Sequence, residues 1–119
     1  MGMEFNDTKP IYQQLMNRIC SEVIRGDRKP GEKLPSVREY AVEAGVNANT
    51  IQRVYRELER EQIVESKRGQ GTFITENNQR LLGLREDMKR EFIGQFIRNM
   101  QEVGYSVDEM VRGIKGEEE

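Results

Sequence analysis

The chain has 119 residues with a formal net charge of −2, and 34% of them are charged while 35% are hydrophobic. This length has room for one compact domain and an appendage, which excludes a large catalytic domain. With one cysteine and no histidine, the chain cannot build a disulfide framework, a Cys/His zinc site or a histidine-based catalytic triad.

Residues 3–9 are polar and are expected to lead loosely into a first helix. That helix is predicted to begin at Pro10, because proline is favoured at a first helical position, with Thr8 as its cap and Gly26 as its end. Its apolar residues recur at helical spacing, at Tyr12, Leu15, Ile19 and Val23. Cys20 lies on the same helix and is most simply a buried core residue.

The stretch from 34 to 62 predicts two helices joined by a tight turn. Ser36 and Glu39 form an S-x-x-E capping box that starts the first helix. Gly45 can take the left-handed conformation that ends it, and Asn47 can cap the second. On the second helix one face carries Ile51, Val54, Tyr55 and Leu58, and the opposite face carries Asn49, Arg53, Arg56 and Arg60 with Gln52 at its margin.

A helix with an apolar back and a cationic front, shortly after another helix, is typical of a helix-turn-helix, whose second helix enters the DNA major groove by its N-terminal end. Asn49 and Gln52 stand at that end and can pair with adenine edges, while arginines can reach guanine or phosphate. The alternative is a surface helix whose charges only solvate it. Glu57 and Glu61 lie apart from the arginine row, which favours DNA binding.

A β-hairpin is predicted to follow, which would complete a winged helix. Lys33 and Leu34 can form a short strand that needs a partner, and the residues after the long helix form a β-prone run, a turn and a returning run, at 63–65, 68–71 and 72–75. Gly69 and Gly71 would let the hairpin tip approach a phosphate backbone, toward which Lys67 and Arg68 project. A nucleotide-binding loop is disfavoured because the third glycine is missing. A merely solvated tip is the remaining alternative.

Four ordered blocks over about residues 10–75 resemble the DNA-binding domain of GntR-family transcriptional regulators. The blocks read PIYQQL at 10–15, PGEKLPSVRE at 30–39, NTI at 49–51 with LE at 58–59, and GQGTFI at 69–74. The resemblance implies operator contacts from the arginine of the second block, the start of the second helix and the wing tip. Carried over, these are Arg38, Asn47, Asn49, Thr50, Gln52, Arg68 and Gly69, and the charge pattern adds Arg53, Arg56 and Lys67.

Two positions depart from the family pattern. Many members have Ser-Arg or Thr-Arg where this chain has Asn47-Ala48, and members commonly carry glycine where it has Gln62. Because Ala48 offers no polar group to a base edge, direct readout is expected to fall on Asn49 and Gln52.

A polar joint at 76–79 precedes a long predicted helix that ends near Val103, and Ser106 opens a last helix by a second capping box. A helix-loop-helix of this size cannot bury its own apolar face, so we expect it to pair with a second copy. The residues expected at this dimer contact are Leu84, Met88, Phe92, Phe96 and Met100. The alternative is that the tail folds back onto the winged helix. The short tail also resembles the YtrA-like branch of the family, which implies a dimeric repressor.

These patterns predict a mostly α fold with a small β-hairpin (α+β), divided into a winged helix-turn-helix at 1–76 and a helical dimerisation tail at 77–119. The predicted function is a sequence-specific DNA-binding regulator, most simply a repressor, that binds a two-fold symmetric operator as a homodimer. The rival hypothesis is a winged-helix scaffold that binds another protein.

No nucleophile–base pair or metal-ligand set supports an enzyme, and no cofactor is expected. A small apolar effector between the tail helices of two subunits stays open as a hypothesis, although plain interface is the commoner use of such residues. No apolar run approaches the roughly 18 residues of a membrane span, and the N-terminus lacks a signal pattern. The expected location is therefore the cytoplasm.

Overall fold

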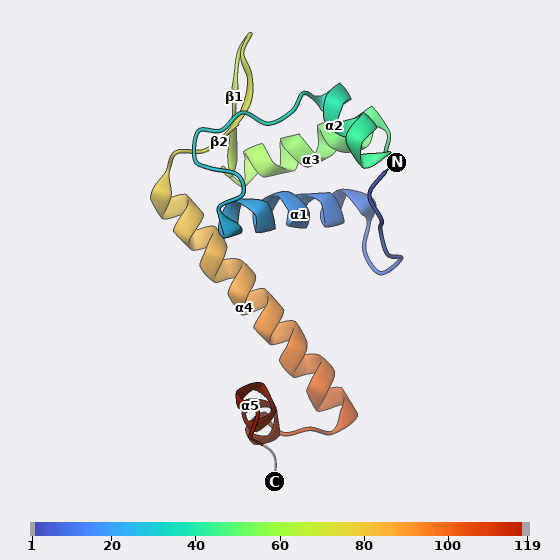
Figure 1. The fold of residues 1–119 in the computed structure, drawn as a ribbon, viewed down its shortest axis with the longest axis vertical. Coiled ribbons are helices and arrows are strands. Elements are labelled where there is room, and N and C mark those ends of the chain that lie inside the picture. The colour runs from blue at the N-terminus through green and yellow to red at the C-terminus, as the bar shows by residue number, and fades with distance from the viewer. Residues whose placement is uncertain (1, 118–119) are drawn as a thin grey trace. The chain divides into compact units, whose positions relative to one another are not determined.

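A computed structural model describes residues 2–117 of the chain (Figure 1). In chain order the elements are α1 (Ile11–Arg25), α2 (Val37–Ala44), α3 (Ala48–Arg60), β1 (Val64–Lys67), β2 (Gly71–Ile74), α4 (Asn78–Val103) and α5 (Val107–Lys115). The predicted mostly α fold with one β-hairpin is confirmed.

Residue contacts divide the chain into two compact units, Met1–Leu84 and Arg85–Glu119. The division falls inside α4, eight residues beyond the boundary predicted at residue 76, because the first turns of α4 pack on the winged helix. Arg80 donates from Nε to the Glu61 carbonyl oxygen at 2.7 Å, and Leu84 is buried. The roles assigned to the two parts of the chain stay predictions.

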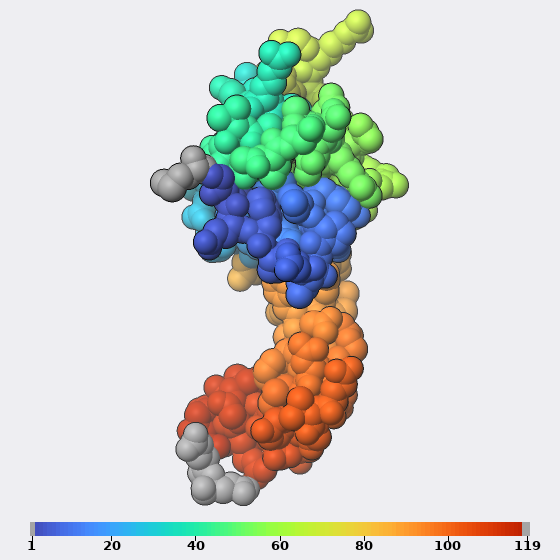
Figure 2. Space-filling view, turned by 90° about the vertical axis from the view of Figure 1, so that its right-hand side faces the viewer, coloured from blue at the N-terminus to red at the C-terminus, as the bar shows by residue number. Residues whose placement is uncertain are grey.

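The N-terminal segment differs from the expectation in two ways. Pro10 stands outside α1 as the residue before its first turn, and no side chain caps the helix, so the Thr8 cap is wrong. The Thr8 hydroxyl instead donates to Asn6 Oδ1 at 2.6 Å. The segment is also attached to the end of α2, because Met3 donates its backbone N–H to the Ala44 carbonyl oxygen at 3.1 Å. Figure 2 shows this dark-blue segment beside the green turn between α2 and α3.

The core of the first unit lies between α1, α2 and α3. The predicted apolar face of α3 is buried in full, at Ile51, Val54, Tyr55 and Leu58. From α1 it meets Leu15, Ile19 and Val23. Cys20 is buried as predicted, and burial raises the pKa of its thiol to about 11. The thiol therefore stays protonated and apolar at neutral pH.

The helix ends of the helix-turn-helix follow the sequence signals. Ser36 and Glu39 form the reciprocal capping box of α2, with the Glu39 N–H donating to Ser36 Oγ at 3.1 Å. Gly45 ends α2 in the left-handed conformation. Asn47 caps α3, accepting through Oδ1 from the Asn49 N–H at 2.7 Å. These caps satisfy amide donors that a helix start leaves without intrahelical partners.

The β-hairpin pairs β1 and β2 as antiparallel strands with Val64 opposite Ile74 and Lys67 opposite Gly71. Val64 and Ile74 are buried, which anchors the base of the hairpin in the core, while its tip projects beyond the helices of this unit (Figure 1). The strand predicted at Lys33 and Leu34 is reduced to a single bridge, between Lys33 and Phe73 of β2.

Gln62, just after α3, has a φ of 62°, a left-handed conformation that costs a residue with a Cβ roughly 1–2 kcal/mol. We therefore expect Gln62→Gly to raise the free energy of unfolding by about 1 kcal/mol, since glycine adopts this conformation without steric cost. Urea denaturation at one fixed protein concentration measures the change. Gln62→Ala is the control, because it removes the same side chain and keeps the Cβ; equal stability of the glycine and alanine variants would contradict the prediction.

In the second unit, α5 packs against the later turns of α4. Gly104 ends α4 with a φ of 110°, and the predicted capping box of Ser106 and Glu109 starts α5. Met110 is buried against α4. The two helices leave an apolar groove of about 420 Å³, lined by Phe92, Ile93, Phe96, Ile97, Val107, Met110, Val111 and Ile114. A search of the described helices found none whose length and hydropathy would allow it to cross a membrane.

Candidate nucleic-acid interface

The N-terminal half of α3 exposes the amides that the sequence placed on its front. Asn49 and Gln52 are exposed, and within residues 2–117 neither side chain forms a hydrogen bond. Asn47 is exposed too, but its side-chain oxygen Oδ1 already accepts a hydrogen bond as the cap of the helix. Thr50 is half-buried. Asn49 and Gln52 are therefore the amides whose donors and acceptors are both free for a base edge.

The arginines of α3 have different surroundings, which sequence spacing did not distinguish. The Arg53 guanidinium lies 3.7 Å from the centroid of the Tyr12 ring, so it is turned toward α1 and held by a cation–π contact. Arg60 is paired with Glu57, and this hydrogen bond lowers the pKa of the Glu57 carboxyl. The expectation that Glu57 lies apart from the arginine row is wrong. The cationic front of α3 is therefore concentrated at Arg56.

Three arginines on three elements remain available. Arg56 of α3, Arg38 in the first turn of α2 and Arg68 at the wing tip are all exposed. Throughout the described part of the chain, none of these three side chains takes part in an ion pair or a hydrogen bond. Beside Arg38, the Glu39 carboxyl has a lowered pKa because it accepts hydrogen bonds from Ser36 in the capping box.

The hairpin tip is polar and cationic, as predicted, with one difference in the role of its glycines. Lys67 and Arg68 are exposed, and the Lys67 ammonium lies 4.7 Å from the centroid of the Phe73 ring. Gly69 has a φ of 76°, and nothing lies within 4 Å of the position its Cβ would occupy. Gly71 has a φ of 124°, and a Cβ there would lie 2.8 Å from Lys33 Cε. Lys33, which the sequence predicts only as part of a short strand, therefore fills the space that Gly71 leaves.

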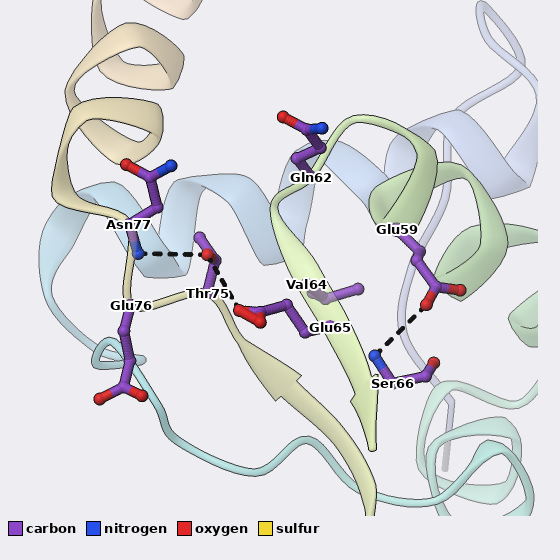
Figure 3. A pocket seen from close by; sticks show the side chains of 8 residues that line it. All are labelled: Glu59, Gln62, Val64, Glu65, Ser66, Thr75, Glu76 and Asn77. Atoms are coloured by element: carbon purple, nitrogen blue, oxygen red, sulfur yellow. Dashed lines mark hydrogen bonds between the residues drawn. The ribbon is translucent and has the colours of Figure 1, made fainter. Parts of the chain in front are cut away.

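A hollow of about 460 Å³ opens where α3, the base of the wing and the start of α4 meet (Figure 3). Its lining includes the carboxylates of Glu59, Glu65 and Glu76 and no basic residue. Thr75 Oγ1 donates to Glu65 at 3.3 Å, and Ser66 donates its N–H to Glu59 at 3.3 Å. Because these carboxylates would repel phosphates, this hollow is not a surface for nucleic acid.

The predicted dimer residues of the tail fall into two groups. Leu84 is only 6% exposed and belongs to the first unit, so the chain's own fold already covers it. Met88 and Met100 are half-buried, while Phe92 and Phe96 are 51% and 40% exposed and line the apolar groove. The apolar groove thus lies beyond Leu84 and is completed by residues of α5.

Comparisons with known proteins agree with this geometry. The model of the family described as "Bacterial regulatory proteins, gntR family" matches residues 11–74. The chain is 46% identical to an uncharacterized HTH-type transcriptional regulator, YhcF of Bacillus subtilis (strain 168), over 97% of this chain and 95% of that protein. It is 39% identical to the HTH-type transcriptional repressor YtrA of the same organism, over 89% and 82%.

Solved structures show the same architecture. A GntR family transcriptional regulator from Listeria monocytogenes has a TM-score of 0.87 and 38% identity, covering 96% of this chain and all of that one. The DNA-binding domain of AraR in complex with operator ORX1 has a TM-score of 0.57 and 27% identity, covering 63% and 99%. The first likeness extends over both units, whereas the second spans only part of this chain.

Proposed function

The chain belongs to the GntR family of bacterial regulatory proteins, and from this premise we propose that it is a transcriptional repressor that binds a two-fold symmetric operator as a homodimer. The observation that carries the proposal is the presence of free amides at the start of α3 together with free arginines on α2, α3 and the wing. One winged helix thereby offers both base-reading and phosphate-binding groups.

Base readout is assigned to Asn49 and Gln52. In the major groove, an amide side chain can donate a hydrogen bond to N7 of adenine and accept one from its N6 amino group, which favours adenine. Arg53 is weighted lower, because its stacking on Tyr12 draws it toward α1. Asn47 and Thr50 serve mainly to build and orient the start of the helix.

Phosphate binding is assigned to the arginines on the three elements and to the wing. Arg38, Arg56 and Arg68 form no salt bridge in the part of the chain that the structure describes, so phosphates would not have to displace one. Lys67 adds a cation next to Arg68, and Gly69 leaves the wing tip without a side chain that would hinder close approach.

Dimerisation is assigned to the apolar groove of the second unit. Phe92 and Phe96 of α4 and Val111 of α5 are at least 40% exposed, and a second copy of the same face would cover them in a self-complementary contact. Two copies would present two wings and two α3 helices to symmetric half-sites. The name of the YtrA relative supports repression as the sign of control. The cytoplasm, where DNA is accessible, is the proposed location.

The proposal is tested by selecting duplexes from a random pool with the purified full chain and then measuring affinity at several salt concentrations. We expect an enriched, two-fold symmetric sequence and an affinity that falls steeply with salt, because phosphate neutralisation releases counterions. A protein-binding scaffold predicts no enriched sequence and no salt-dependent retention on DNA. That outcome would replace the proposal by its rival.

The wing provides a separate prediction. We expect Arg68→Ala to weaken binding to all duplexes by a similar factor and to reduce the slope of log affinity against log salt by about 0.9 for each phosphate that the variant no longer neutralises. Titration of operator and random DNA at several salt concentrations measures this. Arg25→Ala is the charge-matched control, because Arg25 is paired with Asp27 at the end of α1. A wild-type slope for the Arg68 variant would remove the wing tip from the interface.

A further inference from the structure

Lys33 is fixed against the wing by its backbone. It forms a bridge with Phe73 of β2, and the residues on both sides of it are hydrogen-bonded to the same strand. Leu34 donates its N–H to the Thr72 carbonyl oxygen at 2.8 Å, and the Ile74 N–H donates to the Glu32 carbonyl oxygen at 2.8 Å. Lys33 therefore has a set register relative to the hairpin, although it precedes the hairpin by some thirty residues in the chain.

The side chain of Lys33 then crosses the hairpin at Gly71. A Cβ at Gly71 would lie 2.8 Å from Lys33 Cε and 3.6 Å from its Nζ. The methylene stem thus passes over a strand position that has no side chain, and it brings the ammonium next to that strand. Gly71 faces Lys67 in the strand register, and Arg68 follows at the tip. The ammonium of Lys33 therefore lies at the cationic end of the wing.

Lys33 also lies near the start of α2. The pKa of the nearby Glu39 carboxyl is lowered mainly by its hydrogen bonds with Ser36, and the positive charge of Lys33 adds a smaller lowering. The start of α2, which carries the exposed Arg38, is therefore the second element that the charge of Lys33 reaches, besides the wing. Lys33 is exposed, and among residues 2–117 it forms no ion pair.

We propose that Lys33 is a phosphate-binding residue of the DNA interface, held across Gly71 so that its ammonium adds to the cations of the wing, Lys67 and Arg68. The inference rests on the proposed DNA-binding function. Because the stem lies on the strand, part of the rotamer freedom that a surface lysine loses on binding is already lost in the free protein. The absence of a side chain at Gly71 leaves the room that the lysine stem occupies.

The test separates the charge of Lys33 from its packing. Lys33→Met keeps an apolar stem over Gly71 and removes the ammonium, whereas Lys33→Arg keeps a positive charge. Lys29→Met is the matched control, because Lys29 is an exposed lysine of the preceding turn whose ammonium donates to the Gly26 carbonyl oxygen at 3.2 Å. Each full-length variant is titrated with the selected operator and with random duplex over a range of salt, and its unfolding is followed in urea.

For Lys33→Met we expect equal weakening on both DNAs and a salt slope lower by about 0.9 per subunit, hence about 1.8 in a homodimer. Lys33→Arg should keep the wild-type slope, and Lys29→Met should be unchanged. A wild-type slope for Lys33→Met, with salt-dependent binding by the unaltered protein, would overturn the role of Lys33 and leave the proposed function intact. Absence of DNA binding by the unaltered protein would instead refute the proposed function itself.

Discussion

Replacing Phe92 and Phe96 with aspartate is expected to yield monomers that keep their helical signal and lose tight operator binding. The two rings are 51% and 40% exposed in the single chain and line a groove formed by apolar residues alone. Covering the exposed parts of the four rings in a dimer would contribute on the order of 4 kcal/mol, which is about a thousandfold in the dimer dissociation constant. Burying a carboxylate in the same place adds a desolvation penalty.

Sedimentation at micromolar concentration measures this expected dissociation directly. Val42→Asp is the matched control, because Val42 is an apolar residue of α2 that is 81% exposed and lies in the other unit. It should leave the oligomeric state unchanged. A wild-type chain that sediments as a monomer, or a doubly substituted chain that remains a dimer, would show that the groove is not the contact between copies.

Loss of operator affinity in the monomer has its own physical basis. In a dimer the second half-site is bound as an intramolecular event, at an effective concentration set by the connection between the two winged helices. A monomer lacks this gain, while its single winged helix keeps the same base and phosphate groups. We therefore expect the doubly substituted chain to retain salt-dependent binding to random DNA and to lose most of its preference for the symmetric operator.

Asn49→Ala is expected to cost about 1–3 kcal/mol on the selected operator for each base pair it reads, and much less on random DNA. The reason is that only a bidentate contact to a base edge depends on sequence, whereas a phosphate contact weakens all duplexes alike when it is removed. The preference should relax at one symmetric pair of positions. Competition between operator variants at one fixed salt concentration measures both effects.

Asn47→Ala is the informative control for this prediction. Asn47 accepts the Asn49 N–H as the cap of α3, and loss of such a cap typically costs about 1 kcal/mol of stability. Its removal should lower the free energy of unfolding and weaken operator and random DNA by similar factors. If Asn49→Ala also weakened both DNAs equally, Asn49 would only position the helix, and the assignment of base readout to it would be wrong.

Much of the fold could be predicted because its signals are local in the chain. The capping boxes at Ser36 and Ser106 depend on residues three positions apart, and the structure has both. The buried face of α3 follows from a 3.6-residue period, and glycine marks the end of α2 at Gly45. The family resemblance depends on blocks of the same kind, and the match to residues 11–74 confirms it.

The sequence was least informative about which charged groups are free. Arg53, Arg56 and Arg60 form one row by spacing, yet one is stacked on Tyr12 and another is paired with Glu57. Which partner an arginine meets depends on the direction of a long side chain and on what the neighbouring helix presents there. Both are decided by packing between elements.

The tertiary structure alone also decided which surfaces are covered. Leu84 fits the apolar stripe of α4 as well as Phe92 does, but Leu84 is buried by its own unit and Phe92 is half-exposed. Gly71 belongs to the wing by pattern, but the lysine stem that lies where its Cβ would be is visible only in the packed structure, where Lys33 forms a bridge with Phe73. Periodicity states which residues share a face of one element. What lies against that face depends on contacts between residues distant in the chain, and those exist only once the elements have packed.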